Sequence, residues 1–204
     1  MNFRTLKTLI PSAHTACSFY HKPDNQTKQA DSGKKPSSKD DHNPGSCSMP
    51  VRILFVCHGN ICRSVMAQWI MQDLADQNSL ADAFVIDSAA LTDDETGNPI
   101  YYLARQKLSE KGIPIGHHFA RRITRNDYDR YDHIFIMDDE NDWMIRRLFA
   151  VDPAGKIDYL LPGRQEIDDP WYTRDFESCY QEILDGCKIR LKQIVQACCL
   201  NPAD

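Results

Sequence analysis

The feature that most constrains the fold is the short apolar run RILFVC, residues Arg52–Cys57, which leads directly into a polar loop. A nearly continuous apolar run of this length is typical of a central parallel strand buried on both faces. The next segment, residues 64–74, places apolar side chains at helical spacing. A strand, a loop and a helix in this order predict the first unit of an α/β domain.

The same alternation continues along the chain. Further strands are predicted at residues 84–88, 133–137 and, more weakly, 157–161, and further helices at residues 100–111, 140–149 and 176–197. Strands separated by helical segments imply a doubly wound, four-stranded parallel sheet with helices on both faces.

Charge and hydropathy exclude two classes of function. The net charge of −5 and the isoelectric point near 5.8 argue against a nucleic-acid-binding protein. No apolar run approaches the ~20 residues that span a bilayer. We therefore expect no nucleic-acid partner and no membrane insertion.

The first 49 residues differ from the rest in charge and composition. They carry a net charge of +3 and residues 50–204 carry −8, which together make the −5 of the whole chain. The stretch Lys22–Pro50 is rich in Lys, Ser, Pro, Asp and Asn, so it cannot bury enough apolar surface to offset its ordering entropy. We predict a disordered N-terminal extension at 1–49 and one domain at 50–204. A leader ahead of a start at Met49 and a weak organelle-targeting segment are the alternatives.

The polar loop carries the residues of an anion site. A junction between a strand and a helix aims backbone N–H groups at one point, and the helix N-terminus adds partial positive charge. Gly59 allows a tight backbone path, and Arg63 can grip two oxygens of an anion. The same positive field favours the thiolate form of Cys57, a nucleophile placed to attack a bound phosphate. The alternative for Cys57 is a small buried apolar residue at a strand end. The whole loop reads Cys57, His58, Gly59, Asn60, Ile61, Cys62, Arg63, Ser64.

This loop, CHGNICRS, closely resembles the phosphate loop of the low-molecular-weight protein tyrosine phosphatases, whose pattern is C-x-G-N-x-C-R-S. The resemblance covers about residues 51–194 and continues through IDSAA at 86–90, GNP at 97–99, GIP at 112–114, HFAR at 118–121, FIMD at 135–138 and DPWY at 169–172. It implies an enzyme that hydrolyses phosphotyrosine in proteins, or small aryl phosphates, through a phosphocysteine intermediate. We expect a cytoplasmic protein that is monomeric or weakly self-associating. No zinc-type cysteine spacing is present, so we predict no metal and no cofactor.

The resemblance also implies roles for residues outside the loop. Asp169, in the Asp-Pro-aromatic motif, matches the general acid, with its neighbour Asp168 as the competing assignment. Trp171 and Tyr172 match aromatic residues that wall the substrate cleft. Cys62 matches the partner of Cys57 in a reversible disulfide, against the alternative of a buried structural thiol. Four residues match positions that hold the loop by hydrogen bonds, namely Asn60, Ser64, Ser88 and His118.

Three other functions use this fold or loop. An arsenate reductase needs further cysteines in mid-chain, and none lies between Cys62 and Cys179. The arginine phosphatases of the family tend to carry Thr where this chain has Ile61, and an apolar residue better suits an aromatic ester. A phosphate-binding or redox-sensing module without turnover is the third alternative. The acidic segment Thr92–Glu95 stands at the expected cleft edge, which predicts that acidic peptides are disfavoured, and His58 occupies a loop position that is often apolar in the family.

Overall fold

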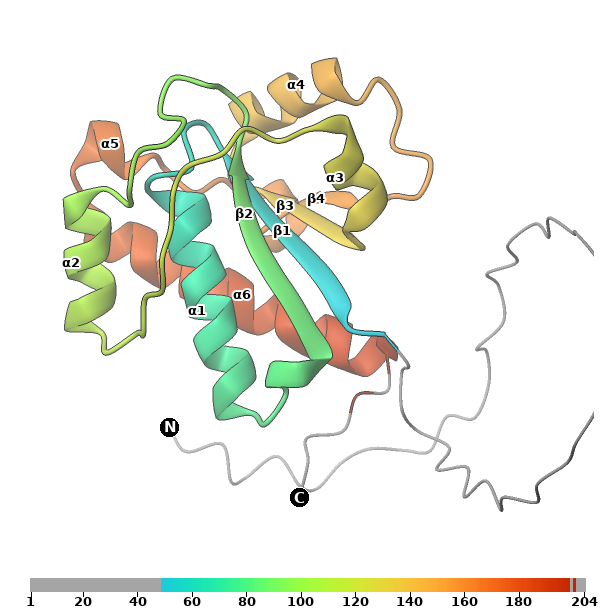
Figure 1. Cartoon of the computed structure of the whole chain (residues 1–204), viewed down its shortest axis with the longest axis horizontal. Helices are drawn as coiled ribbons and strands as arrows, with labels where there is room; N and C mark the ends of the chain where they lie inside the picture. The colour runs from blue at the N-terminus through green and yellow to red at the C-terminus, as the bar shows by residue number, and fades with distance from the viewer. Residues whose placement is uncertain (1–48, 199, 201–204) are drawn as a thin grey trace, which may run out of the picture. The chain divides into compact units, whose positions relative to one another are not determined.

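The computed structural model describes residues 49–198 and 200, so the extension predicted at 1–49 lies outside the described residues except for Met49. The strands form one four-stranded sheet in the order β2-β1-β3-β4, and every neighbouring pair is parallel (Figure 1). This confirms the predicted sheet. The strands are β1 (Val51–Cys57), β2 (Phe84–Ala90), β3 (His133–Ile136) and β4 (Ile157–Tyr159).

Helices cover both faces of the sheet, as predicted, and each face has its own core. Alternate residues of β1 point to opposite faces, so Ile53 and Phe55 join one cluster while Leu54 and Val56 join the other. The first cluster takes side chains from α1 (Arg63–Gln77), α2 (Tyr102–Glu110) and α6 (Phe176–Cys198). The second takes them from α3 (Arg125–Arg130) and α4 (Asp139–Leu148). From Ile53 to Cys57 the run RILFVC is apolar because both of its faces are buried, and the one charged residue, Arg52, is only partly buried.

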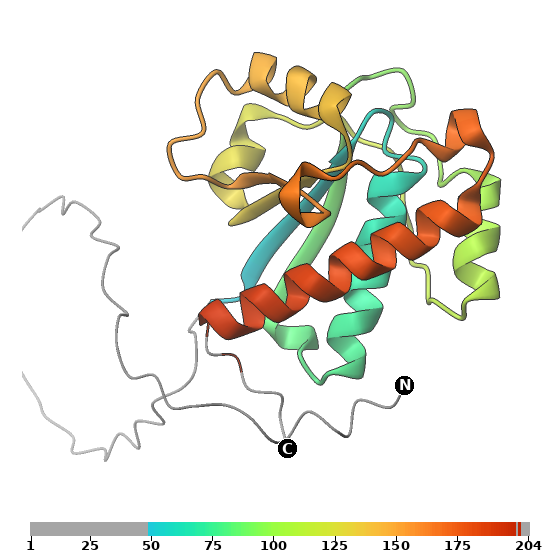
Figure 2. The same cartoon turned by 180° about the vertical axis from the view of Figure 1, so that it is seen from behind.

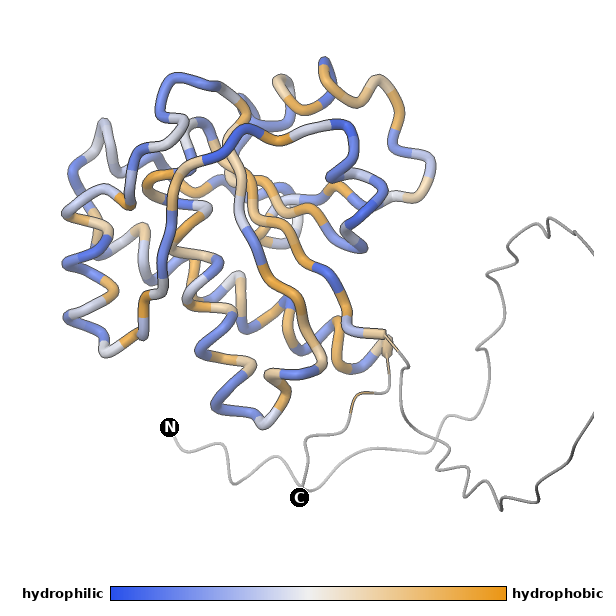
Figure 3. Tube along the Cα trace, viewed as in Figure 1, coloured by the Kyte–Doolittle hydropathy of each residue, from blue (hydrophilic) through white to orange (hydrophobic). Residues whose placement is uncertain are grey.

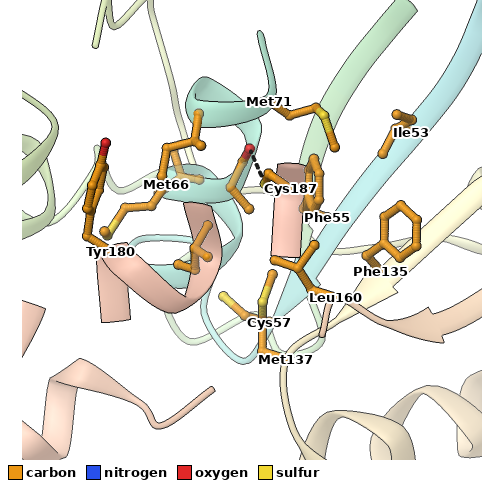
Figure 4. Close-up of a cluster of buried hydrophobic side chains, with 14 of the residues drawn as sticks. Ile53, Phe55, Cys57, Met66, Met71, Phe135, Met137, Leu160, Tyr180 and Cys187 are labelled. Carbon is orange, nitrogen blue, oxygen red and sulfur yellow. Dashed lines mark hydrogen bonds between the residues drawn. The ribbon is translucent and has the colours of Figure 1, made fainter. Parts of the chain in front are cut away.

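The two longest helices pack on each other beneath the sheet. Helix α6 buries residues at intervals of three and four, including Cys179, Tyr180, Ile183 and Cys187. It crosses behind α1 in Figure 1 and in front of α1 in the reverse view of Figure 2. Gly186 permits close packing of α6 against Leu160, which follows β4, since a Cβ there would lie 2.7 Å from Leu160 Cγ. Figure 4 shows the resulting core between α1, α6 and the sheet, where the Cys187 thiol donates a hydrogen bond to the Ala67 carbonyl at 3.7 Å.

The segments that sequence periodicity did not predict are short. They are the 3-10 turns η2 (Ala81–Ala83) and η3 (Pro162–Arg164), the six-residue α3 and the single turn α5 (Pro170–Thr173). Each of these segments is too short to show a helical repeat of apolar residues. Capping residues start two of them: Thr124 and Asp127 form a capping box for α3, and Asp169 caps α5.

Some predicted bounds also shift. The helix predicted from residue 100 begins at Tyr102, and the fourth strand ends at Tyr159 rather than 161, because η3 starts at Pro162.

Apolar segments concentrate along the strands, and the outward turns of the helices are hydrophilic (Figure 3). Among the described residues, no helix has the length and apolar character required to span a bilayer.

Candidate active site

The loop between β1 and α1 forms the floor of the site. It leaves the carboxyl end of β1 at Cys57 and enters α1 at Arg63, with no side chain capping the helix N-terminus. Within the described part of the chain, the backbone N–H groups of residues 58–62 donate no hydrogen bond. Unused N–H donors at a helix N-terminus form a binding site for an anion.

Asn60 holds this loop from inside. It is fully buried and adopts a left-handed backbone conformation with φ of 58°, which asparagine tolerates better than most residues. Its side-chain Nδ2 donates to Ser64 Oγ and to Ser88 Oγ, each at 2.9 Å, and its Oδ1 accepts from the Arg121 backbone N–H at 3.2 Å. The loop is therefore tied to α1, to β2 and to the segment that follows α2.

These bonds determine where the two serine hydroxyls can donate. Because Asn60 uses both Nδ2 hydrogens on the serine oxygens, each hydroxyl keeps its own hydrogen for another acceptor. Ser88 donates to Gln68 Oε1 at 2.6 Å. Ser64 Oγ lies 3.1 Å from Cys57 Sγ, within hydrogen-bonding distance of the sulfur. Gln68, on α1, was not predicted as a site residue, since no motif in the sequence points to it.

His118 contacts the same loop from the segment after α2. Its Nε2 donates to the Asn60 carbonyl at 2.8 Å, which makes Nε2 the protonated ring nitrogen. Burial lowers the pKa of His118, although the bond to Asn60 and the charge of Asp87 act in the opposite direction. The structure thus brings together all four residues that the sequence assigned to holding the loop.

Arg63 is a buried cation at the first position of α1, only 1% exposed. Its Nη1 donates to Asp138 and, at 2.9 Å, to the Ile167 carbonyl, and its Nη2 donates to Asp169 Oδ2 at 2.6 Å. Its Nε has no hydrogen-bond partner among the described residues. Burial alone lowers the pKa of this guanidinium, but the nearby Cys57 and two carboxylates outweigh that effect and raise the pKa above its ordinary value.

Asp138 was not predicted as a site residue, although the FIMD motif contains it. It follows β3 and caps α4 by accepting from the Asn141 backbone N–H at 2.6 Å while it also binds Arg63. A carboxylate at the carboxyl end of a strand next to the loop-bearing strand is the signal that could have found it. Asp138 therefore fixes one edge of the Arg63 guanidinium.

Asp169 reaches Arg63 from the other side of the cleft. One of its oxygens accepts from Arg63, and the other accepts from the Trp171 backbone N–H at 3.0 Å, which caps α5. Its neighbour Asp168 is exposed and does not line the cleft. Of the two adjacent acids, the structure brings only Asp169 to the loop.

Cys57, Arg63 and Asp169 line one cleft, together with loop residues His58, Gly59, Ile61 and Cys62, the aromatic residues Trp171 and Tyr172, and the acidic residues Asp94, Glu95 and Glu140. Trp171 is 40% exposed and packs edge-on against Tyr101, with ring centroids 5.0 Å apart. Tyr172 is 79% exposed. Tyr101 was not predicted, because it lies 70 residues before Trp171 in the chain.

Cys62 lines the cleft beside Cys57, and both are buried free thiols. Burial raises the pKa of the Cys62 thiol well above its ordinary value, and the charge of Cys57 adds to that effect. Cys62 is therefore a protonated thiol at neutral pH. Cys179 and Cys187, both on α6, are also buried.

Comparisons with known proteins agree on one family. The sequence profile of the family described as low molecular weight phosphotyrosine protein phosphatase matches residues 52–198. The low molecular weight protein-tyrosine-phosphatase YfkJ of Bacillus subtilis is 36% identical over 149 residues, which are 71% of this chain and 96% of the relative.

Solved structures agree with this match. The crystal structure of YfkJ superposes with a TM-score of 0.72 at 33% identity, over 74% of this chain and 99% of that one. A Drosophila structure titled arginine phosphatase superposes with a TM-score of 0.63 at 29% identity, over 70% of this chain and 96% of that one.

Proposed function

The chain belongs to the low molecular weight phosphotyrosine protein phosphatase family, and on that premise we propose that it hydrolyses phosphotyrosine and small aryl phosphates through a phosphocysteine on Cys57. One observation carries the proposal. Arg63 is buried at the cleft floor with Nη1 fixed and Nε unpartnered within the described chain, beside a cysteine that contacts the Ser64 hydroxyl. This arrangement supplies a nucleophile and a cationic clamp to one phosphate.

In the first step, the Cys57 thiolate attacks phosphorus. The sulfur–phosphorus bond forms as the bond from phosphorus to the aryl oxygen breaks, and Asp169 transfers its proton to that oxygen. The Ser64 hydroxyl donates to the thiolate, since Asn60 already donates to its oxygen. Arg63 and the N–H groups of residues 58–62 stabilise the negative charge on the transferring phosphoryl oxygens.

In the second step, water attacks the phosphocysteine. The Asp169 carboxylate accepts a proton from that water, the sulfur–phosphorus bond breaks, and phosphate leaves with the Cys57 thiolate restored. Asp169 serves both steps because the proton that it gives to the aryl oxygen is replaced by the proton that it takes from water. The substrate phosphate competes with Asp169 for Arg63 Nη2, to which Asp169 is bonded at 2.6 Å. Phosphate binding thus releases Asp169 toward the leaving oxygen.

Cys62 makes the oxidation of Cys57 reversible by forming a disulfide with it. A peroxide oxidises the Cys57 thiolate to a sulfenic acid, the Cys62 thiol then attacks that sulfur, and water leaves as the disulfide forms. A cellular dithiol reduces the disulfide by exchange and restores both thiols. The two sulfurs line the same cleft, which supports this role for Cys62.

A protein arginine phosphatase is the second candidate, favoured by the structural match to the Drosophila protein of that title. Ile61 lines the cleft, and its apolar side chain suits a phenyl ring better than a guanidinium. Competition between a phosphotyrosine peptide and a matched phosphoarginine peptide separates the two, and we expect phosphotyrosine to give the higher kcat/KM.

The proposal is tested by hydrolysis of an aryl phosphate by the full chain in the presence of EDTA. Wild type is compared with Cys57→Ser and with Cys187→Ser, the same substitution at a buried cysteine outside the cleft (Figure 4). We expect turnover by wild type and Cys187→Ser and none by Cys57→Ser. Equal rates for all three proteins would exclude Cys57 as the nucleophile.

A further inference from the structure

The mouth of the cleft carries an acidic rim, defined here as Asp94, Glu95 and Glu140. Asp94 and Glu95 lie in the segment after β2, and Glu140 lies in the first turn of α4. Glu95 packs directly over the phosphate loop, since a Cβ on Gly59 would lie 3.0 Å from Glu95 Cγ. The rim therefore approaches the phosphate site from two separate elements.

No lysine or arginine of the described chain pairs with the acidic rim. Glu95 accepts from the Asn98 side-chain amide at 2.7 Å, and Asp94 lies 3.4 Å from His58 Nε2, which is a cation only when protonated. By contrast Asp93, just outside the rim, pairs with Arg122 at 3.2 Å. The negative charge of the rim is thus available to whatever enters the cleft.

At the floor of the cleft, below the rim, a separate observation points to an anionic ligand. Arg63 is a cation there, only 1% exposed, and its Nε has no hydrogen-bond partner within the described residues. The floor therefore selects an anion and the rim repels one. A ligand satisfies both only if it carries a phosphate at one point and positive charge around it.

We propose that the acidic rim selects phosphotyrosine in a basic context, with lysine or arginine on the residues that flank the phosphotyrosine in the substrate protein. This inference rests on the proposed function, because it assumes that the phosphate binds over Cys57 and Arg63. The rim acids lie at the mouth rather than the floor, so they act on flanking residues while the loop residues hold the phosphoryl group.

Asp94 and Glu140 are exposed to solvent, so each ion pair that the rim forms with a bound peptide contributes only modestly to its affinity. An exposed ion pair contributes ~0.2–1 kcal/mol, which corresponds to about a 1.4- to 5-fold change in affinity. Several pairs together steer association and are screened by salt. We expect a preference of about 10-fold in kcat/KM for a basic over an acidic peptide at low ionic strength, mostly through KM.

The test uses three phosphotyrosine peptides that differ only at the flanking residues, which are lysine, serine or glutamate. The full chain is assayed with each peptide and with a small aryl phosphate, at low and at raised ionic strength. The rim variant is Asp94→Asn with Glu140→Gln. Its matched control is Asp82→Asn with Asp129→Asn, which removes the same charge from exposed positions outside the cleft.

We expect kcat/KM to be highest for the peptide with flanking lysine, intermediate for serine and lowest for glutamate. Raised ionic strength and the rim variant should both reduce the differences in kcat/KM between the peptides, and the control variant should leave them unchanged. The inference would be overturned if the enzyme hydrolysed the aryl phosphate but did not show this order of peptides. It would also be overturned if the rim variant and the control variant reduced the differences in kcat/KM equally. Absence of aryl phosphate turnover would count against the proposed function instead. In that case the binding of the same peptides to Cys57→Ser, measured by fluorescence anisotropy, reports the rim preference, and equal affinities would overturn the inference.

Discussion

The two sides of the cleft are built in opposite ways. The phosphate loop is held by hydrogen bonds to three separate parts of the chain, two of them buried and one partly buried, and all three meet at Asn60. The opposite side is the single exposed turn α5, where Asp169 bonds its own helix and Arg63. Trp171 on that turn rests on Tyr101. This difference indicates that the phosphate-binding side is preorganised, while the leaving-group side can adjust to the substrate.

The largest effect is expected from Arg63→Lys, which tests the preorganised side. Lysine keeps the charge but cannot bind Asp138 and a phosphate at the same time through a planar fork. We expect kcat/KM for an aryl phosphate to fall by about 10³-fold. Steady-state kinetics measures this, with circular dichroism to verify folding. A folded variant within a few-fold of wild type would show that a point charge suffices.

A smaller effect is expected from Asp169→Asn, which tests the adjustable side. Asparagine can still cap α5 but cannot transfer a proton, so kcat should fall by about 10²-fold for a poor leaving group. The loss should shrink as the phenol becomes more acidic, because such a leaving group departs without a proton. A series of aryl phosphates measures the trend, and a constant loss across it would remove Asp169 from the role of general acid.

Substitutions on the two sides of the cleft should change the free energy of unfolding by different amounts. Asn60→Ala leaves buried serine oxygens without a donor and puts alanine at a φ of 58°, so the free energy of unfolding should fall by about 3 kcal/mol. Trp171→Ala, at a position 40% exposed, should cost about 1 kcal/mol or less and mainly raise KM. Urea unfolding compares the variants. Equal losses would contradict the distinction between the two sides.

The smallest effect concerns pH and His118. Because burial lowers its pKa in the folded state below the ordinary 6.5, the unfolded chain binds more protons in that range. Its contribution to stability is therefore complete above pH 6.5 and is lost as pH falls through the folded pKa. His118→Gln keeps a donor for the Asn60 carbonyl but does not titrate. We expect a shallower loss of stability below pH 6.5 in this variant, measured by urea unfolding across pH. An unchanged pH slope would show that His118 does not contribute to it.

Much of the fold could be predicted because its signals are local. The apolar run at residues 52–57 and the spacing of apolar residues in α6 indicate burial by themselves. The loop motif also placed Cys57 and Arg63 together, since they lie within one short segment. Short elements such as α5 were missed, because one turn has no period to detect.

The unpredicted site residues act across long sequence distances. Asp138 binds Arg63, which lies 75 residues earlier in the chain. Tyr101, at the N-terminus of α2, packs against Trp171 of α5. Gln68 receives a bond from Ser88 only because α1 packs beside β2. Tyr101 and Gln68 have no local pattern that distinguishes them, and the position of Asp138 after a strand does not identify Arg63 as its partner, so these contacts become visible only in the folded chain.

Covalent transfer of phosphate to Cys57 is the central step of the proposed mechanism, and the most direct measurement is to trap that intermediate. The full chain is mixed with an aryl phosphate, denatured within the first turnover, digested and examined by mass spectrometry, with Cys57→Ser in parallel. We expect phosphate on the peptide that contains Cys57 in wild type and on no peptide of the variant. Turnover by wild type with phosphate on another residue, or with no phosphorylated peptide at any quench time, would contradict the proposed mechanism.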